Sequence, residues 1–408
     1  MAIHTEVLVV GGGVAGLASA WHLARAGRRV LVVESADQLG AHSSGQNAAI
    51  LRSLIADEAL TRIGRAAAER LHRPPVGFCE TPLVRATGLL LTAEADLRPE
   101  LLAWPDRLPS APYAECRAEV VSRREAMELL PPLAPPAAED PDAPFALFLP
   151  GEGELDVAAL VQAFAAGART AGRSGGRDAE VLTGAEVRQL TVDASGAVIG
   201  AELADGRTIT AEQTLIAGGA WAGALGHGVG SPLAFAPRRR HLAVSAASPT
   251  VDHDWPVVWN QGADFYARPE SGGLMLCGCD ETLVEPAGPP SHGPCPTDPA
   301  ALELVAERTA RFLPAFADAR VASWWAGWRT FAEVAEDGGH PFAIGPDPAV
   351  SGLFWAAGLG GHGMTSSFEV GRVAAAELVR ARGERPGGEL EGEDYAGSFL
   401  PRAPLAAR

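Results

Sequence analysis

Three glycines near the N-terminus have the spacing of a dinucleotide-binding turn. Gly11, Gly13 and Gly16 follow the apolar run Glu6–Val10 and precede a helical pattern over residues 14–26. Such glycines permit a tight turn, let the backbone approach a pyrophosphate, and let the helix pack closely on the strand. The helix N-terminus then offers free N–H groups and a positive dipole to phosphate. The motif predicts cofactor contacts from Gly11, Gly13, Val14, Ala15 and Gly16.

Glu34 supports the same site. It closes a second strand-like run, residues 29–34, and lies 18 residues after Gly16. A carboxylate at that position accepts hydrogen bonds from ribose hydroxyls and disfavours a 2′-phosphate. We expect Glu34 and the adjacent Ser35 to contact the cofactor.

Two further loops favour FAD over NAD. An NAD enzyme usually continues through regular βα units after the second strand. Here a small polar loop, 42–49, follows instead, and a glycine loop, 358–365, leads into a helix near the C-terminus. A glycine loop at a helix N-terminus places positive potential beside the pyrimidine end of a reduced flavin. The predicted cofactor-binding residues of these loops are Ser43, Ser44, Gln46, Asn47, Ala48, Ala49, Gly360, Gly361, His362, Gly363, Met364 and Thr365.

The overall charge argues against nucleic acid and anionic lipid as partners. The 408 residues include 50 acidic and 33 basic side chains, a formal net charge of −17, and this field repels polyanions. No apolar run reaches the roughly 18–20 residues of a membrane span. The first strand begins at Glu6, which leaves no room for a signal peptide. We expect a soluble, cytoplasmic protein.

Cysteine and lysine usage narrow the chemistry further. The five cysteines, Cys79, Cys116, Cys277, Cys279 and Cys295, show no metal-ligand spacing, so we expect reduced thiols and no metal. The sequence contains no lysine, and all its basic side chains other than histidine are arginine. Chemistry based on a lysine amine is therefore excluded.

Segments with a strand–helix–strand pattern alternate along the chain with segments of short strands, and this arrangement predicts an α/β fold of two interleaved domains. Strand–helix–strand patterns fill residues 1–84, 151–228 and 327–408, which we assign to a discontinuous Rossmann-type FAD-binding domain. Short alternating strands fill 85–150 and 229–326, which we assign to an inserted α+β substrate-binding domain built on an antiparallel sheet.

The motifs resemble those of the D-amino-acid oxidase superfamily, which includes glycine oxidase, sarcosine oxidase and, nearest to this chain, bacterial D-arginine dehydrogenase. The resemblance extends from residue 7 to about 370, nearly the whole chain. Besides the glycine motifs, the matching stretches are Pro74–Leu83, Ala217–Trp221, Pro237–Arg240, His253–Pro256, Phe265–Tyr266, Trp325–Arg329 and Gly360–Ser366. The resemblance implies FAD, contacted also by Val181, Ala217, Gly218, Trp221 and Arg329. Some sarcosine oxidases attach FAD through a cysteine near the C-terminal glycine loop, but no cysteine follows Cys295, so we expect non-covalent FAD.

The resemblance also implies a substrate site. In the family, a tyrosine and an arginine hold the substrate carboxylate beneath the flavin, and their matches are Tyr266 and Arg329. Arginine suits this role because its planar fork donates two parallel hydrogen bonds. The alternative for Arg329 is a structural ion pair with Glu333 or Asp337. Arg240 matches a further active-site arginine, although a solvated strand start would also explain it.

Four positions depart from D-arginine dehydrogenase. Leu89 aligns with its cation-binding carboxylate, and Ile50, Arg52 and Ile55 align with the histidine, threonine and tyrosine of a mobile loop. An apolar pocket disfavours a cationic substrate, because an uncompensated charge is costly to bury. Arg52 would pair with an acidic substrate if it pointed inward; we favour the outward orientation, which is the default for arginine.

These features predict oxidation of the Cα–N bond of a small carboxylate-bearing substrate, a D-amino acid with a neutral or apolar side chain. Hydride would pass to flavin N5, giving an imino acid, and the later electron acceptor is left open. His362, in the glycine loop, is a candidate catalytic residue, although its backbone alone would also explain its position. The alternatives are a 2-hydroxy acid dehydrogenase, with His362 as its general base, and a flavin-binding accessory subunit without turnover.

Overall fold

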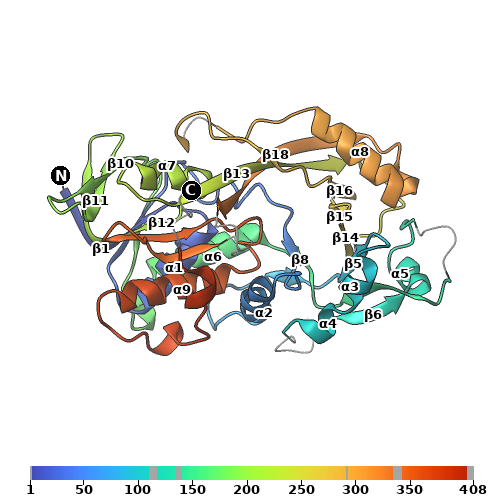
Figure 1. Ribbon diagram of the computed structural model, residues 1–408, viewed down its shortest axis with the longest axis horizontal. Helices are drawn as coiled ribbons and strands as arrows, with labels where there is room; N and C mark the ends of the chain where they lie inside the picture. The colour runs from blue at the N-terminus through green and yellow to red at the C-terminus, as the bar shows by residue number, and fades with distance from the viewer. Residues whose placement is uncertain (1, 110–116, 135–139, 291–292, 334–341, 402–408) are drawn as a thin grey trace, which may run out of the picture.

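The structure is a computed structural model that describes residues 2–109, 117–134, 140–290, 293–333 and 342–401. Two large sheets form two lobes, and a long two-stranded ribbon runs from one lobe into the other (Figure 1). A small third sheet joins β3 (Ile50–Leu51), β8 (Gly153–Leu155) and β4 (Val84–Arg85) in the region between the lobes.

The first sheet is parallel at its centre. There β1 pairs in parallel with β2 on one side and with β12 on the other. Beyond them, β2 pairs in parallel with β9, and β12 pairs in parallel with β20. An antiparallel extension adds β10, β11 and β19. The strands are β1 (Ala2–Val10), β2 (Val30–Val33), β9 (Glu180–Leu182), β10 (Val187–Val192), β11 (Val198–Leu203), β12 (Thr208–Ile216), β19 (Ala343–Pro346) and β20 (Leu353–Ala357).

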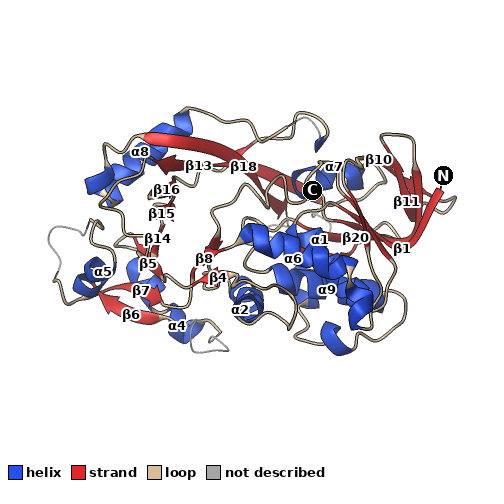
Figure 2. Cartoon of the chain, turned by 180° about the vertical axis from the view of Figure 1, so that it is seen from behind, coloured by secondary structure: helices blue, strands red, loops and turns tan. Residues whose placement is uncertain are grey.

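Both faces of the second half of β1 are covered, which explains the apolar run Val7–Val10. Val7 and Val9 face a core formed with α1 (Val14–Arg25), α6 (Val157–Arg169) and α9 (Ser367–Arg380), and Figure 2 shows these helices grouped beside the sheet. Leu8 and Val10 face a second core on the other side. The helix α1 packs against both α6 and α9 and so fixes the turn that precedes it.

The second sheet is mostly antiparallel and has the order β17-β13-β16-β15-β14-β5-β7-β6, with β18 paired to β13. Its strands are β5 (Leu89–Ala93), β6 (Glu119–Ser122), β7 (Pro144–Leu149), β13 (Ala234–Ser245), β14 (Val257–Gln261), β15 (Phe265–Glu270), β16 (Gly273–Cys277), β17 (Thr282–Leu283) and β18 (Val321–Glu333). The predicted antiparallel sheet needs one correction, because β5 and β14 pair in parallel. This pair joins the two sequence segments that build the sheet.

Two features interrupt the short alternating strands expected in the inserted segments. Gly88 separates β4 from β5, because it adopts a φ of +93° and its added Cβ would lie 2.4 Å from the Phe148 ring. The segment 229–326 also contains a helix, α8 (Ala300–Phe312). The remaining helices are α2 (Glu58–His72), α3 (Arg98–Leu102), α4 (Trp104–Arg107), α5 (Arg123–Leu129), α7 (Ala222–His227) and α10 (Ala396–Phe399).

The exact domain limits stay a prediction. The strands of the two large sheets come from the segments named above, except that β18 of the second sheet crosses the expected limit between residues 326 and 327. Across the described ranges, no helix combines the length and apolar composition that crossing a bilayer would require.

Gly16 provides a test of how α1 is seated on β1. An added Cβ would lie 2.0 Å from the Gly11 carbonyl oxygen, a backbone atom that cannot move aside cheaply. We expect Gly16→Ala to destabilise the protein by about 1–3 kcal/mol, as other overpacked sites do, and to lower its FAD content. Thermal unfolding and flavin absorbance measure the two effects. Gly387→Ala is the control, since no atom of the described residues lies within 4 Å of that Cβ; equal behaviour of both variants would contradict the packing role.

Candidate active site

A cavity of about 760 Å³ lies along the glycine turn, the end of β2 and the C-terminal glycine loop. Most of the predicted cofactor residues line it: Gly11, Gly13, Val14, Ala15, Glu34, Ser35, Ser43, Ser44, Asn47, Ala217, Gly218, Trp221, Arg329, Gly360, Gly361, Gly363 and Met364. The sequence motifs, which are far apart along the chain, therefore meet around one space.

The glycine turn has the geometry that a pyrophosphate requires. Gly11 adopts a φ of +116°, and a Cβ there would lie 2.4 Å from the Ala217 carbonyl oxygen. The Val14 N–H, at the start of α1, donates to Ser44 Oγ over 2.9 Å and ties the 42–49 loop to the helix N-terminus. The Glu34 carboxylate accepts from the Gly12 N–H over 2.6 Å and faces the cavity. These residues fit a dinucleotide with a free ribose.

Seven of the predicted cofactor residues do not line this cavity: Gly16, Gln46, Ala48, Ala49, Val181, His362 and Thr365. Gly16 instead provides the close packing described above. Ala49 has a φ of +52°, and its N–H donates to Asn47 Oδ1 over 2.6 Å, so Asn47 stabilises the bend of the loop. Gln46 reaches the substrate side through its carbonyl oxygen, which accepts from Arg329 over 3.0 Å.

The sequence did not indicate two other parts of the cavity wall. One is 185–188, which ends in the first two residues of β10; the other is 285–290, which closes over the indole of Trp221. Trp221 Nε1 donates to the Gly288 carbonyl over 2.8 Å, and its ring packs against His42 and Trp328. Trp221 and Trp328, which pack against each other, both lie in stretches that match the family, and this aromatic pair was the sequence feature that could have indicated this part of the wall.

Register explains why the two predicted arginines share a face. In the β13/β18 ribbon, Arg240 lies opposite Gly327, and Arg238 lies opposite Arg329. Side chains alternate across a strand, so Arg240 and Arg329 project to the side on which Leu242 packs against Tyr266. Gly327 leaves room there, because its Cβ would lie 2.6 Å from the Gln46 carbonyl and 3.0 Å from Arg329 Nη1.

Arg329 is buried and held by backbone carbonyls. Its Nη1 and Nη2 donate to the carbonyls of Trp328 and Gln46 over 3.1 and 3.0 Å. Burial lowers the pKa of its guanidinium. In the described part of the chain no carboxylate forms an ion pair with Arg329, Glu333 included; Asp337, its other alternative partner, lies outside that part. The charge is therefore positioned but not neutralised by these residues.

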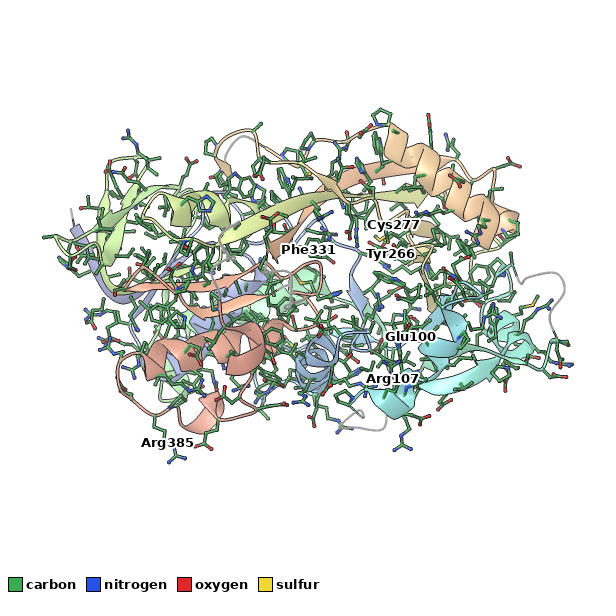
Figure 3. The ribbon with its side chains drawn as sticks, viewed as in Figure 1. Glu100, Arg107, Tyr266, Cys277, Phe331 and Arg385 are labelled. Carbon is green, nitrogen blue, oxygen red and sulfur yellow. The ribbon has the colours of Figure 1, made fainter. Side chains whose placement is uncertain are left out.

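Tyr266 lies beside this charge. It projects from β15 next to Cys277 at the end of β16 (Figure 3), and only 3% of its surface is exposed. Its ring stacks on Trp259, with centroids 4.4 Å apart. Burial raises the pKa of the Tyr266 phenol well above its usual range. Tyr266 is thus a neutral hydroxyl donor near Arg329 and Arg240.

Arg240 differs from the solvated strand start that was the alternative. It is only 9% exposed and forms an ion pair with Glu281. Its neighbours on the other face, Arg239 and His241, pair with Asp298 and Asp280. The alternation of side chains along β13 therefore places Arg240 on the face of Tyr266, and it places Arg239 and His241 on the opposite face, where they bind acidic residues of the segment after β16.

The outward orientation favoured for Arg52 is wrong. Its guanidinium carbon lies 4.2 Å from the centre of the Trp259 ring, and its Nε is fully shielded and finds no hydrogen-bond partner among the residues that the structure describes. Burial lowers the pKa of Arg52 to about 10. The aromatic face of Trp259, on a strand distant in sequence, attracts the guanidinium, which is why the default for exposed arginine fails here.

The three apolar positions do not form one pocket wall. Leu89 is fully buried among Leu91, Leu147 and Val257, and Ile50 packs between that cluster and the Tyr266 cluster. Ile55 packs instead against the core of the first sheet. These three residues therefore do not line one common apolar pocket, as the sequence suggested that they would.

His362 is neutral at ordinary pH. Burial, together with the charges of Arg52 and Arg240, lowers its pKa to about 3. Its backbone has a clear role, because its carbonyl accepts from the Ser366 hydroxyl over 2.9 Å near the start of α9. A histidine with so low a pKa is a weak proton acceptor.

Two thiols border Tyr266 and Arg240. Cys277 and Cys279 are free, their sulfur atoms are 4.0 Å apart, and the Cys279 N–H donates to Cys277 Sγ over 3.2 Å. Cys79 and Cys295 are also free, and Cys116 lies outside the described residues.

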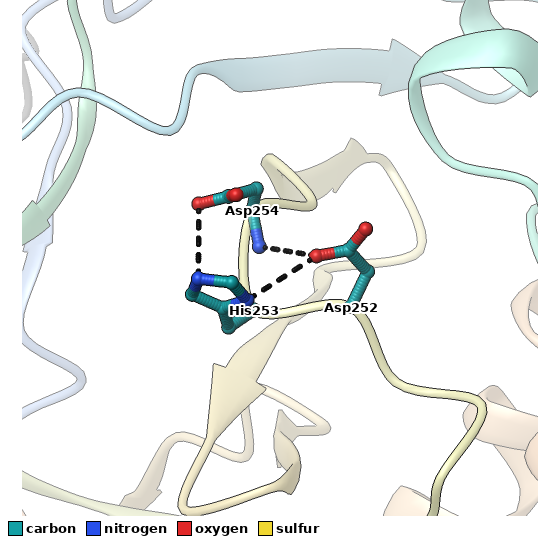
Figure 4. Close-up of side chains that lie close together, drawn as sticks. All are labelled: Asp252, His253 and Asp254. Atoms are coloured by element: carbon teal, nitrogen blue, oxygen red, sulfur yellow. Dashed lines mark hydrogen bonds and ion pairs between the residues drawn. The ribbon is translucent and has the colours of Figure 1, made fainter.

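One group of metal-ligand side chains occurs among the described residues: Asp252, His253 and Asp254 (Figure 4). All three are exposed, and Asp254 also pairs with Arg85 over 2.7 Å. The group lies on the turn before β14, where the Asp252 carboxylate accepts from the Asp254 N–H. It stabilises a turn.

The cavity at the glycine turn, next to a buried tyrosine and arginine, is the arrangement of a flavin-dependent oxidoreductase. A sequence profile of the FAD-dependent oxidoreductase family matches residues 6–377, and the chain belongs to this family. It is therefore an enzyme that uses FAD, which agrees with the predicted cofactor.

Similar proteins include glycine oxidases. The chain is 29% identical to glycine oxidase from Geobacillus kaustophilus, over 92% of this chain and 93% of that protein, and 27% identical to glycine oxidase from Pseudomonas putida, over 86% and 87%. The crystal structure of the Geobacillus kaustophilus enzyme matches with a TM-score of 0.74, at 25% identity, over 98% of this chain and 99% of that one. FAD-bound L-α-glycerophosphate oxidase from Mycoplasma pneumoniae shares the fold, with a TM-score of 0.73 at 17% identity over 92% and 94%.

The buried carboxyl of Glu152 makes the stability of the folded protein depend on pH, and this dependence can be measured. This carboxyl is fully buried, accepts from the Ser53 N–H over 2.8 Å, and has a pKa raised by burial to about 7. Between pH 4.5 and 7 the unfolded chain releases this proton while the folded protein keeps it, so stability falls as pH rises. The full effect is on the order of 3 kcal/mol.

Glu152→Gln removes this ionisation, so its thermal unfolding midpoint should fall less than that of the unmodified protein between pH 5 and pH 8. The exposed Glu58→Gln is the control. The same pH dependence in all three proteins would show that Glu152 ionises normally.

Proposed function

We propose that this enzyme oxidises the C–N bond of a small amino acid whose carboxylate binds Arg329 and Tyr266. The observation behind the proposal is the buried Arg329 guanidinium, which borders the flavin cavity and has no carboxylate partner among the described residues. A buried positive charge without a partner is costly, and a bidentate carboxylate ligand compensates it. The similarity to glycine oxidases supports the same substrate class.

The residues fit FAD as follows. Gly11, Gly13 and the N-terminus of α1 would hold the pyrophosphate, and Glu34 would hold the ribose. The end of the flavin ring would lie against Gly360, Gly361, Gly363 and Met364. Bound flavin accepts a hydride equivalent from the substrate carbon. We propose that it is held without a covalent bond.

The protein's own task is orientation. Arg329 and Tyr266 fix the carboxylate, which holds the Cα–H bond in one direction. The translational and rotational entropy of the substrate is then lost on binding, so its loss no longer adds to the barrier of the reaction. Once the ammonium group of the substrate has lost a proton to water, the neutral amine supplies the electron pair that forms the C=N bond as hydride leaves the Cα atom, which gives the protonated imine. No protein base is needed for the C–H cleavage.

This last feature favours an amine over a hydroxyl as the reacting group. Oxidation of a 2-hydroxy acid requires a base for the hydroxyl proton. His362, the candidate base, has a pKa of about 3 and holds a proton poorly at neutral pH. The 2-hydroxy acid alternative therefore has less support than amine oxidation. The accessory-subunit alternative also loses support, because the buried Arg329 and Tyr266 remain in place.

Anaerobic mixing with a substrate panel tests the proposal. Amino acids should bleach the flavin absorbance near 450 nm, whereas the matching 2-hydroxy acids should not. The panel includes glycine, sarcosine and both enantiomers of alanine, since the D configuration remains a prediction. Bleaching by hydroxy acids alone would overturn the proposal.

Arg329→Ala should weaken binding of substrates and carboxylate inhibitors by at least about 30-fold, because truncating a buried charged partner costs about 2–5 kcal/mol. Titration of the flavin spectrum with benzoate measures the affinity. Arg62→Ala, on the exposed face of α2, is the matched control. Full benzoate affinity in Arg329→Ala, with normal FAD content, would return Arg329 to a structural role.

A further inference from the structure

Arg52 connects the flavin loop with the tyrosine that faces the substrate. Its backbone N–H donates to Thr365 Oγ1 over 3.2 Å, in the C-terminal glycine loop. Its guanidinium lies over Trp259, whose ring in turn stacks on Tyr266. The charges of Arg52 and Arg240 both act on His362, in the same loop. Arg52 therefore belongs to the group of side chains around Tyr266.

The charge of Arg52 is not balanced by the residues around it. Among the described residues, no carboxylate oxygen lies within ion-pair distance of its guanidinium, and its shielded Nε has no hydrogen-bond partner. Glu152 is an acidic neighbour, but Ser53 occupies its Oε1, and its pKa of about 7 leaves it only partly ionised at neutral pH. Trp259 attracts the cation without neutralising it.

The arrangement contrasts with Arg240, which has Glu281 as its partner. Arg52 and Arg329 are the two guanidiniums near Tyr266 for which the described residues supply no carboxylate. If Arg329 receives the carboxylate next to the reacting carbon, Arg52 remains as a second anion receptor. A neutral or apolar side chain on the substrate would leave that receptor without a partner.

We propose that Arg52 binds a second carboxylate of the substrate, so that the enzyme selects amino or imino dicarboxylic acids. The inference rests on the proposed function, since Arg329 must hold the first carboxylate. A desolvated guanidinium gains most from an anion that meets its planar fork with two hydrogen bonds. Trp259 fixes the plane of the guanidinium before the substrate arrives, which reduces the entropy lost on binding.

Isosteric substrate pairs test the proposal in the unmodified holoenzyme. Aspartate is compared with asparagine and glutamate with glutamine, each as both enantiomers, and iminodiacetate with sarcosine. Anaerobic flavin reduction gives kcat/KM for each. We expect the best diacid to exceed its neutral partner at least about 30-fold, which corresponds to about 2 kcal/mol.

Substitution of Arg52 assigns that preference to the residue. Arg52→Met keeps the length of the side chain and its packing on Trp259, and it should reduce the diacid-to-amide ratio to near one. Arg52→Lys keeps the charge but not the fork, so its ratio should be intermediate. Arg62→Met, an exposed arginine on α2, should leave the ratio unchanged.

Dicarboxylate binding provides a readout that is independent of turnover. Malonate, succinate and glutarate are titrated against acetate and butyrate, with the flavin spectrum as the signal. One of the dicarboxylates should bind at least about 30-fold more tightly than its monocarboxylate analogue, and Arg52→Met should remove the difference.

The outcomes separate the two proposals. Amino acids that bleach the flavin without any preference for diacids would overturn the role of Arg52 and leave amine oxidation intact. Tight dicarboxylate binding that depends on Arg52, with no amino acid oxidised, would support the anion receptor and overturn the proposed function. If Arg52→Met loses FAD, the isosteric pairs and Arg52→Lys still decide.

Discussion

The burial of positive charge beside the flavin cavity constrains the rest of this structure. Arg52, Arg240 and Arg329 act on one another or on common neighbours, and each guanidinium removed from water needs polar partners. Arg329 receives two backbone carbonyls, and Arg240 receives Glu281. Only a framework that fixes backbone carbonyls and strand faces at this point can hold so much like charge together.

The β13/β18 ribbon provides that framework. It extends from the lobe of the first sheet into the second sheet, as the ribbon view shows (Figure 1), and its long antiparallel register keeps Arg240 and Arg329 on one face. The same alternation buries His241 and Trp328 on the opposite face. A change of register by one residue would exchange the two faces. The apolar side chains of the ribbon therefore determine where its charges lie.

Local signals explain what could be predicted from the sequence. The turn at Gly11–Gly16, the strand–helix pattern around it and the glycine loop before α9 depend on neighbouring residues, and these predictions agree with the structure. The break at Gly88 and the helix α8 were missed, since the first depends on a contact with Phe148 and the second interrupts an alternating region. The family resemblance, rather than any local pattern, pointed to Tyr266 and Arg329.

The orientation of Arg52 shows the limit of such reasoning. A loop arginine with no partner nearby in sequence is expected to face solvent, where hydration costs nothing. Here Trp259 comes from another sheet, and Thr365 from the opposite end of the chain fixes the Arg52 backbone. The sequence of residues 50–55 predicts neither of these contacts. The composition of this short loop suggested an apolar wall, but its one charged residue turns inward, and that single direction changes the kind of substrate side chain the site would stabilise.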